Sequence, residues 1–387
     1  MLANRTLLFQ GGTVYTGRTV LDEGWVLVRG GRIAALGSGR PPADAAVTAR
    51  AFDLDGRALL PGLIDLHAHG ALGCDTMDAD RDCLHTMAAF YAQHGATRFL
   101  AATMSAEAPA IQAALRAVAE VRAEGTGGAI LEGVHLEGPY LDRDHAGAQA
   151  ACALRGAQAS EYLPLLDTGV VRIVTLAPEI PENRALIAEA RGRGIIVSMG
   201  HTGANYERAC EAVELGVTHV THVYNAMPPL HHREPGAVAA ALLQGALTCE
   251  IIADLVHVHP AMLSLAWRLK GPDRLALVTD AMAGTGVPDG TYALGGRPVR
   301  VEGGIARGAN GALAGSTLTM ERALANMAAA IREPLQAILP AATRVPARAL
   351  GLQAGEIAVG LAGDLVVLSA SGEVDLTAVS GQIVWER

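Results

Sequence analysis

The sequence lacks a net positive charge, a paired set of cysteines and any long apolar run. Its formal net charge is −9 at pH 7, which argues against nucleic acid or an anionic membrane as the main partner. The five cysteines are odd in number and scattered, without a CxxC pair, and this predicts free thiols in a reducing compartment. No apolar run reaches the roughly 18 residues of a membrane span, and the run at 7–9 is too short for a signal peptide. We therefore expect a soluble, cytoplasmic protein.

Lysine is also scarce, because Lys270 is the only lysine among the 30 basic residues. It ends a helical pattern over 265–270 and is followed by Gly271, which predicts a helix C-terminus. Many hydrolases with two metal ions bridge the ions with a modified lysine on a barrel strand. A metal bridge in this chain would therefore have to be a carboxylate.

The two ends of the chain have the same sequence pattern. Residues 1–58 and 350–387 contain short predicted strands separated by glycine turns, at 6–9, 25–29, 32–36, 51–54, 364–368 and 382–385. Neither end alone has enough strands to bury a core. We therefore expect the two ends to form one small β-sandwich domain.

Residues 59–349 alternate apolar runs with alanine-rich helical patterns, which is typical of βα units and a parallel sheet. The eight apolar runs span 62–69, 97–103, 129–137, 171–178, 195–201, 217–225, 250–257 and 275–280. Helical patterns over 83–94, 108–124, 182–193, 206–215, 235–244, 260–270 and 318–332 follow most of them. The pattern predicts an α/β fold with a catalytic (β/α)8 TIM-like barrel over 59–349. A doubly wound open sheet is the competing architecture.

Histidines and acidic residues stand at the ends of these runs. His67 and His69 end the first run two residues apart, so both side chains point to the same face of a strand. Later runs end in or near Glu137, His201, His222, His257 and Asp280. Any one of these residues could be a helix cap or a solvated loop residue. Together they have the layout of a zinc, iron or manganese centre, because barrel catalysis takes place at the C-terminal strand ends.

A series of motifs covers nearly the whole chain. They are PGLIDLHAHG at 61–70, DTMDA at 75–79, HLEGPY at 135–140, LAPE at 176–179, GHT at 200–202, THVYNAM at 221–227, REPG at 233–236, VTDA at 278–281 and GSTLTM at 315–320. In this order they resemble the N-acetylglucosamine-6-phosphate deacetylase family of the amidohydrolase superfamily. The HLEGP, YNAM and REPG segments are the most specific to that family, whereas a His-x-His pair and a late aspartate are common across the superfamily.

The resemblance implies a metal site. By position, Glu137, His201 and His222 would be ligands of a principal divalent ion, with Glu137 replacing the modified lysine. His67 and His69 would support a second ion. Some family members have glutamine and asparagine at those two positions and hold one ion, so one or two ions per subunit are expected, with zinc or iron as the metal.

The resemblance also implies a substrate site and an assembly. The matching positions are Ala148, Gln149, Asn225, Ala226, Arg233, His257, Leu313, Ala314, Gly315 and Ser316. Arg233 and His257 would bind a phosphate. The family suggests a homodimer, in which these two residues could reach a neighbouring subunit's site. The chain departs from the family at Gln149, where some members have histidine, at Leu255, usually glycine, and at Ala283-Gly284.

The leading hypothesis is a metal-dependent hydrolase that converts N-acetyl-D-glucosamine 6-phosphate to D-glucosamine 6-phosphate and acetate in amino sugar catabolism or cell-wall recycling. Asp280 matches the catalytic aspartate and would act first as general base and then as general acid. His135, by position, would help to stabilise the oxyanion or contact the substrate. Two alternatives stay open: another amidohydrolase acting on a different N-acyl or cyclic amide, and a catalytically silent barrel used in assembly. The retained ligand positions count against the silent barrel.

Overall fold

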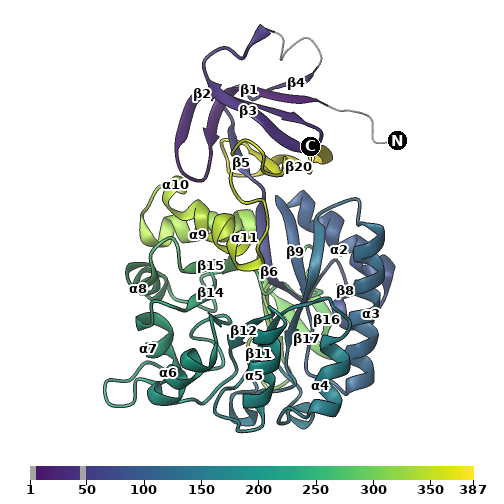
Figure 1. Cartoon of the computed structure of the whole chain (residues 1–387), viewed down its shortest axis with the longest axis vertical. Coiled ribbons are helices and arrows are strands. Elements are labelled where there is room, and N and C mark those ends of the chain that lie inside the picture. Colours follow the sequence, from purple (N-terminus) through teal and green to yellow (C-terminus); the bar gives the residue numbers. More distant parts are fainter. Residues whose placement is uncertain (1–5, 44–48) are drawn as a thin grey trace.

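A small sheet unites the two ends of the chain in the computed structural model, which describes residues 6–43 and 49–387 (Figure 1). Its strand order is β21-β20-β19-β5-β1-β2-β3, with β4 paired to β1. The strands are β1 (Leu7–Tyr15), β2 (Val20–Arg29), β3 (Arg32–Ser38), β4 (Arg50–Asp53), β5 (Ala58–Pro61), β19 (Leu365–Leu368), β20 (Val374–Val379) and β21 (Gln382–Glu386). The prediction of a separate sandwich built from both ends is confirmed.

Strand β5 is the connection between the two ends. It runs parallel to β1 and antiparallel to β19, and its Leu59 packs with Phe9 and Leu365 in a core of its own. The exact domain limits at 58 and 350 stay a prediction. Residues 1–5 and 44–48, which belong to the predicted small domain, lie outside the described residues.

Eight parallel strands form the large sheet, in the order β15-β14-β13-β12-β11-β10-β9-β6. They are β6 (Leu63–Ala68), β9 (Ala96–Ala102), β10 (Ile130–Glu137), β11 (Val171–Leu176), β12 (Ile196–Met199), β13 (His219–Val220), β14 (Thr248–Ile252) and β15 (Leu275–Val278). A parallel bridge between Ala68 and Ala281 brings the ends of the first and last strands together. The sheet therefore nearly closes into a barrel, and each predicted apolar run contributes one strand, which confirms the predicted fold class.

Helices surround the barrel, and the small domain lies at one end of it (Figure 1). The helices are α2 (Arg81–Gln93), α3 (Ala108–Glu124), α4 (Ala159–Leu166), α5 (Asn183–Gly192), α6 (Tyr206–Leu215), α7 (Gly236–Leu243), α8 (Pro260–Lys270), α9 (Met320–Ile331), α10 (Leu335–Ile338) and α11 (Arg344–Leu350), with 3-10 turns η1 (Thr76–Asp78), η2 (Arg143–His145), η3 (Ala151–Ala153) and η4 (Leu339–Ala342). Within the described residues, no helix is long and apolar enough to cross a membrane.

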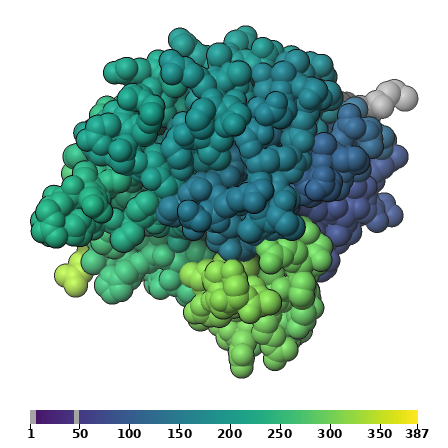
Figure 2. Space-filling view, turned by 90° about the horizontal axis from the view of Figure 1, so that it is seen from below, coloured from purple at the N-terminus to yellow at the C-terminus, as the bar shows by residue number. Residues whose placement is uncertain are grey.

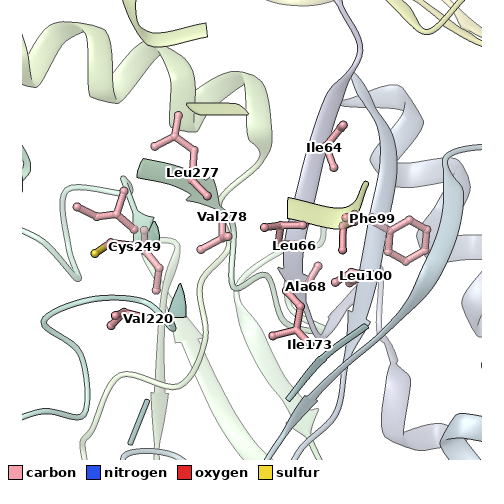
Figure 3. Close-up of a cluster of buried hydrophobic side chains, with 14 of the residues drawn as sticks. Ile64, Leu66, Ala68, Phe99, Leu100, Ile173, Val220, Cys249, Leu277 and Val278 are labelled. Atoms are coloured by element: carbon pink, nitrogen blue, oxygen red, sulfur yellow. The ribbon is translucent and has the colours of Figure 1, made fainter. Parts of the chain in front are cut away.

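Strand β6 shows how the barrel separates apolar from polar side chains. Ile64, Leu66 and Ala68 belong to the large apolar cluster, together with residues of neighbouring strands (Figure 3). The alternate residues Asp65 and His67 are polar yet fully buried. Because successive side chains of a strand point to opposite faces, β6 presents a polar row on its second face. That row leads to His69 and the candidate site.

Lys270 ends α8, as predicted. Its ammonium group donates to the carbonyl oxygens of Ala241 at 2.9 Å and Gln244 at 2.8 Å, near the end of α7. This single lysine therefore forms hydrogen bonds with free carbonyl groups at the end of α7, and it does not approach the C-terminal ends of the barrel strands.

A further sheet follows β15 and was not predicted. It contains the antiparallel strands β16 (Gly290–Leu294), β17 (Arg297–Glu302) and β18 (Ile305–Gly308), while β7 (Gly70–Ala71) and β8 (Cys74–Asp75) form a two-stranded ribbon after β6. Figure 2, which looks at the face opposite the small domain, shows the three-stranded segment in light green as a lobe that projects from one side of the barrel. Leu294 of this lobe lines the candidate pocket described below.

Candidate metal centre and pocket

Glu137, His201 and His222 form the first cluster of metal-ligating side chains, called here the principal group. Glu137 ends β10, and the two histidines follow β12 and β13. Glu137 Oε1 lies 3.1 Å from His201 Nε2 and 3.0 Å from His222 Nε2. All three side chains are buried, so the sequence-predicted principal ligands meet at one point.

His67, His69 and Asp280 form a second group beside it. Asp280 Oδ1 is 3.2 Å from His69 Nε2 and 3.6 Å from His67 Nε2. The two Nε2 atoms are 3.2 Å apart. In each group the candidate ligand atoms lie within 4.8 Å of one another, so each group can surround a cation.

The Glu137 carboxylate stands between the two groups. Its Oε1 atom lies 3.7 Å from His67 Nε2, and its Oε2 atom lies 3.4 Å from His69 Nε2. A carboxylate can use both oxygens, so Glu137 has the position that a bridge between two ions requires. The scarcity of lysine in the sequence predicted that any metal bridge in this chain would be a carboxylate.

The electrostatics of the site favour positive charge. Burial disfavours the charged form of His69, but Asp280 and Glu137 outweigh burial and raise the pKa of His69 to about 9. Burial likewise opposes ionisation of Asp280, yet the hydrogen bond from His69 and the nearby imidazoles lower the pKa of Asp280 to about 2. The two carboxylates therefore stay ionised and attract cations into a buried space.

The donor set fits a transition-metal ion. Imidazole nitrogens and carboxylate oxygens are the ligands that zinc and iron prefer in catalytic sites. Among the described residues, the Nδ1 atoms of His69 and His222 have no hydrogen-bond partner, and the Nε2 atoms of His67 and His69 converge on one place. Two imidazole nitrogens that face one another beside the carboxylates of Asp280 and Glu137 are readily explained by a cation that all of them can bind.

A pocket of about 210 Å³ opens above the two groups. Seven of the sequence-predicted substrate residues line it, namely Ala148, Gln149, Asn225, Ala226, His257, Leu313 and Gly315, as do His69, Glu137, His201, His222 and Asp280. Met104, Gly147, Leu294 and Ala312 also line it and were not predicted. Their apolar or small side chains carry no pattern that separates them from core residues in the sequence.

Gln149 reaches the metal centre itself. Its amide nitrogen donates to Glu137 Oε2 at 2.7 Å, and its amide oxygen accepts from the Ser105 backbone N–H at 2.7 Å. The side chain is buried. Gln149 therefore orients the carboxylate of the principal group, beyond the substrate contact that sequence similarity suggested.

His257 is held in the pocket wall by Asp254. The carboxylate of Asp254 accepts from the backbone N–H groups of Val256 and His257 and lies 2.6 Å from His257 Nδ1. Burial opposes the charge of Asp254, but its hydrogen bond with His257 lowers the pKa of Asp254 below its usual range. Leu255, in the same turn, has a φ of 66°, a conformation that suits glycine, the residue that the family resemblance led us to expect at this position.

Four predicted substrate residues do not line the pocket within this single chain. His135 lies below it, where its Nδ1 is 2.9 Å from the Leu66 oxygen and its Nε2 is 2.6 Å from Thr175 Oγ1. Both ring nitrogens thus have partners in this structure, and the oxyanion or substrate contact of His135 stays a prediction. Ala314 and Ser316, on either side of Gly315, are buried, and Arg233 is exposed on the loop before α7.

Two buried acids under the site were also missed. Asp65 accepts from Thr279 Oγ1 at 2.5 Å and from the His67 N–H at 3.1 Å, and burial raises the pKa of Asp65 to about 6. Glu250 lies 3.2 Å from His67 Nδ1. The available signal was a charged residue inside an otherwise apolar strand, since such residues are rarely buried without a partner.

Comparison with known proteins agrees with this geometry. The sequence matches the amidohydrolase family over residues 58–384. A Bacillus subtilis relative named N-acetylglucosamine-6-phosphate deacetylase is 37% identical over 98% of this chain and 97% of its own length. An Escherichia coli O157:H7 relative named N-acetylgalactosamine-6-phosphate deacetylase is 35% identical over 95% of this chain and 97% of its own length.

A solved structure is similarly close. It is a mutant N-acetyl-D-glucosamine-6-phosphate deacetylase from Mycobacterium smegmatis in complex with N-acetyl-D-glucosamine-6-phosphate, with a TM-score of 0.92 and 36% identity over 98% of this chain and 99% of that chain. Extensive similarity in sequence and fold thus accompanies the arrangement of histidines and acids at the barrel rim. The chain belongs to the N-acetylglucosamine-6-phosphate deacetylase family of amidohydrolases.

Proposed function

We propose that the protein hydrolyses the acetamide of N-acetyl-D-glucosamine 6-phosphate and releases D-glucosamine 6-phosphate and acetate. The observation that carries the proposal is the Glu137 carboxylate between two histidine groups, with Asp280 beside them at the base of a pocket. In a chain of this family, that arrangement supports metal-dependent hydrolysis of a linear amide.

Glu137, His201 and His222 would hold the principal ion, and His67 and His69 would support a second. Zinc or iron is the metal we propose for this set of nitrogen and oxygen ligands. A divalent cation bound there polarises an amide carbonyl and makes water acidic enough to attack it at neutral pH.

Asp280 is the group to which we assign proton transfer. Its carboxylate lines the pocket and is ionised, so it can accept a proton from the attacking water. As the bond between the acetyl carbon and the sugar nitrogen breaks, Asp280 returns that proton to the nitrogen. The products are acetate and the amine, and the carboxylate is regenerated.

Recognition of the sugar phosphate involves the pocket wall and, in our proposal, a second subunit. His257 and Asn225 line the pocket, whereas Arg233 is exposed and outside it. The segments that carry Arg233 and His257 also expose Leu230, Leu255 and Val256, apolar side chains that a second copy of the chain would cover. We propose a homodimer in which Arg233 of one subunit binds the phosphate held by the other.

A reducing, cytoplasmic location is part of the proposal. It is supported by the five cysteines, all of which are free thiols. Disulfides are rare in that compartment, and unpaired cysteines are common there.

Acetate release from purified enzyme tests the activity. N-acetylglucosamine 6-phosphate should be the best substrate, ahead of its unphosphorylated form, and chelation of the metal should abolish turnover. N-acetylgalactosamine 6-phosphate is the second candidate, because one relative carries that name. Release from neither phosphorylated sugar would overturn the proposal and favour another amide or a silent barrel.

Arg233→Ala tests phosphate recognition. A hydrogen bond to a charged group contributes about 1.5–3 kcal/mol, so kcat/KM for the phosphorylated sugar should fall about ten- to hundredfold and that for the unphosphorylated sugar should not. Arg208→Ala, an exposed arginine on α6, is the matched control. Equal losses on both sugars would contradict a phosphate contact.

Mixed dimers test where Arg233 acts. Co-expression of Arg233→Ala with Asp280→Asn should restore activity, because one site of the mixed dimer then has an intact Asp280 and receives Arg233 from the other subunit. If Arg233 served its own subunit, neither site of the mixed dimer would be complete. Absence of restored activity in isolated mixed dimers would therefore contradict the shared site.

A further inference from the structure

Glu250 is a fully buried acid that the mechanism above does not use. It lies in β14, and its side chain is completely inaccessible to solvent. Among the described residues, no lysine or arginine nitrogen lies within 4 Å of its carboxylate; the neighbours are His67 Nδ1 at 3.2 Å and His135 Nδ1 at 3.8 Å. Burying a charge is costly unless it is paired, so a compensating partner must explain Glu250.

His135 is not that partner. Its Nδ1 is already 2.9 Å from the Leu66 carbonyl oxygen, and its Nε2 is engaged with Thr175. Glu250 Oε1, the oxygen nearest to His135, has no hydrogen-bond partner among the described residues. The hydrogen bond of Glu250 is therefore made by Oε2 with His67.

His67 connects Glu250 to the candidate cation site. When Nδ1 donates to Glu250, the lone pair of Nε2 is free on the opposite side of the ring. That nitrogen lies 3.2 Å from His69 Nε2 and 3.6 Å from Asp280 Oδ1. Metal-binding histidines commonly donate their other nitrogen to a carboxylate, which fixes the ring orientation and makes the imidazole a stronger ligand.

We propose that Glu250 is a positioning residue that fixes His67 as a ligand and thereby strengthens the cation site of His67, His69 and Asp280. The positive charge of the bound cation, transmitted through His67, compensates the buried carboxylate. The proposal rests on the metal centre of the proposed function, but it does not depend on which amide is hydrolysed.

Zinc binding to the full-length protein tests the proposal. We would measure zinc per chain after dialysis and the affinity of each site by competition with a chromogenic chelator. Removal of an outer carboxylate typically weakens metal binding about 10- to 100-fold. Glu250→Gln should therefore weaken one zinc site by about that factor and leave the other within about twofold. Glu250→Asp, which keeps the charge but shortens the reach, should lie between Gln and wild type.

Glu132→Gln is the matched control, because Glu132 is also a buried glutamate on a barrel strand but pairs with Arg98. It should bind zinc as the wild type does. A double-mutant cycle with His67→Ala adds a second criterion: in that background Glu250→Gln should cause no further loss of zinc affinity, because the two side chains act together.

Thermal unfolding distinguishes positioning from a general structural role. A positioning role predicts that zinc raises the melting temperature of Glu250→Gln less than that of wild type, since stabilisation follows affinity. Between the metal-free proteins, the melting temperature of the variant should differ less from wild type than it does between the zinc-loaded proteins, because glutamine can still accept the hydrogen bond from His67. A structural role predicts equal destabilisation with and without zinc, and this result would overturn the proposal even if Glu250→Gln folds poorly.

The failures of the two proposals are separable. Loss of one zinc in Glu250→Gln without any deacetylation by the wild type would leave the role of Glu250 intact and reject the proposed substrate. Deacetylation by a wild type whose zinc binding is unchanged in Glu250→Gln would overturn the role of Glu250 alone. A wild type with a single zinc that survives His67→Ala would also overturn it.

Discussion

Replacing Asp280 with asparagine removes a charge and a proton acceptor while keeping the shape of the side chain. In the structure, Asp280 Oδ1 lies 3.2 Å from His69 Nε2, at the base of the pocket. The principal group of Glu137, His201 and His222 does not include it. We therefore expect Asp280→Asn to keep the principal ion and to lose the proton transfer that we assign to this residue.

The size of the loss follows from the type of catalysis. A positioned acid or base contributes about 10²- to 10⁴-fold, so kcat should fall by at least about 10²-fold. The hydrogen bond with Asp280 is the largest influence that raises the pKa of His69. In the metal-free variant, the pKa of His69 should therefore be lower than its value of about 9 in the parent protein.

Three measurements check this prediction together. Steady-state acetate release gives kcat and KM, metal analysis gives the ion content, and NMR titration of the metal-free protein follows His69. Asp273→Asn, at an exposed aspartate after α8, is the control and should match the wild type. Activity of Asp280→Asn within a few-fold of wild type would refute the assignment of Asp280 as the base. Complete loss of all metal would show that Asp280 is mainly a ligand.

Other predictions address single positions. Gln149→Ala removes the 2.7 Å hydrogen bond to Glu137 and should weaken binding of the principal ion about ten- to hundredfold in a chelator competition; an unchanged affinity would contradict its orienting role. Leu255 has a φ of 66°, a conformation that costs an ordinary residue about 1–2 kcal/mol and that Leu255→Gly relieves. Part of this gain is offset by the greater backbone entropy of glycine in the unfolded chain, so the free energy of unfolding in urea titrations should rise by about 0.5–1 kcal/mol. Burial lowers the pKa of His219 to about 4. As the pH falls below about 6.5, His219 binds a proton in the unfolded protein before it does so in the folded protein. Between pH 7 and pH 5 the free energy of unfolding of wild type should therefore fall by about 2 kcal/mol more than that of His219→Gln. Equal decreases in the two proteins would refute this.

The barrel was predictable because its strands are apolar and because apolar residues recur at helical spacing in its helices. The patterns at 108–124, 206–215 and 260–270 coincide with α3, α6 and α8. The sixth run was predicted over 217–225, but β13 contains only His219–Val220. Beyond β13 the chain turns, with φ values of 28° at His222 and 81° at Tyr224. Hydrophobicity alone does not reveal such a turn, since buried loop residues are as apolar as strand residues.

The elements that escaped prediction have identifiable causes. Helix α4 contains Pro164, which reads as a helix breaker. The lobe of β16 to β18 has glycine pairs at 295–296 and 303–304 that occupy positive φ and close its two hairpins. Such pairs are a hairpin signal, and they would have identified the lobe. Glu250 was counted as part of an apolar run, so its side chain was not considered.

The backbone around the site shows how Asp280 is held in place and what supports it. His201, His222 and Asp280 have φ values of 46°, 28° and 51°, and such conformations cost about 1–3 kcal/mol each unless the surroundings enforce them. Two backbone hydrogen bonds hold Asp280 in this conformation. Its N–H donates to the His67 carbonyl oxygen at 2.8 Å, and its carbonyl oxygen accepts from the Ser316 N–H at 2.7 Å.

Ser316 supports the backbone of Asp280, while the substrate contact that its motif suggested stays a prediction. Its hydroxyl donates to the Thr279 oxygen at 2.5 Å, and its backbone holds Asp280. Gly315, just before it, has a φ of 63°, and an added Cβ would lie 3.0 Å from the Asp280 oxygen. A motif cannot distinguish a residue that contacts substrate from one that supports the strained backbone of a neighbouring residue such as Asp280. That distinction requires the hydrogen bonds, which depend on residues far apart in the chain.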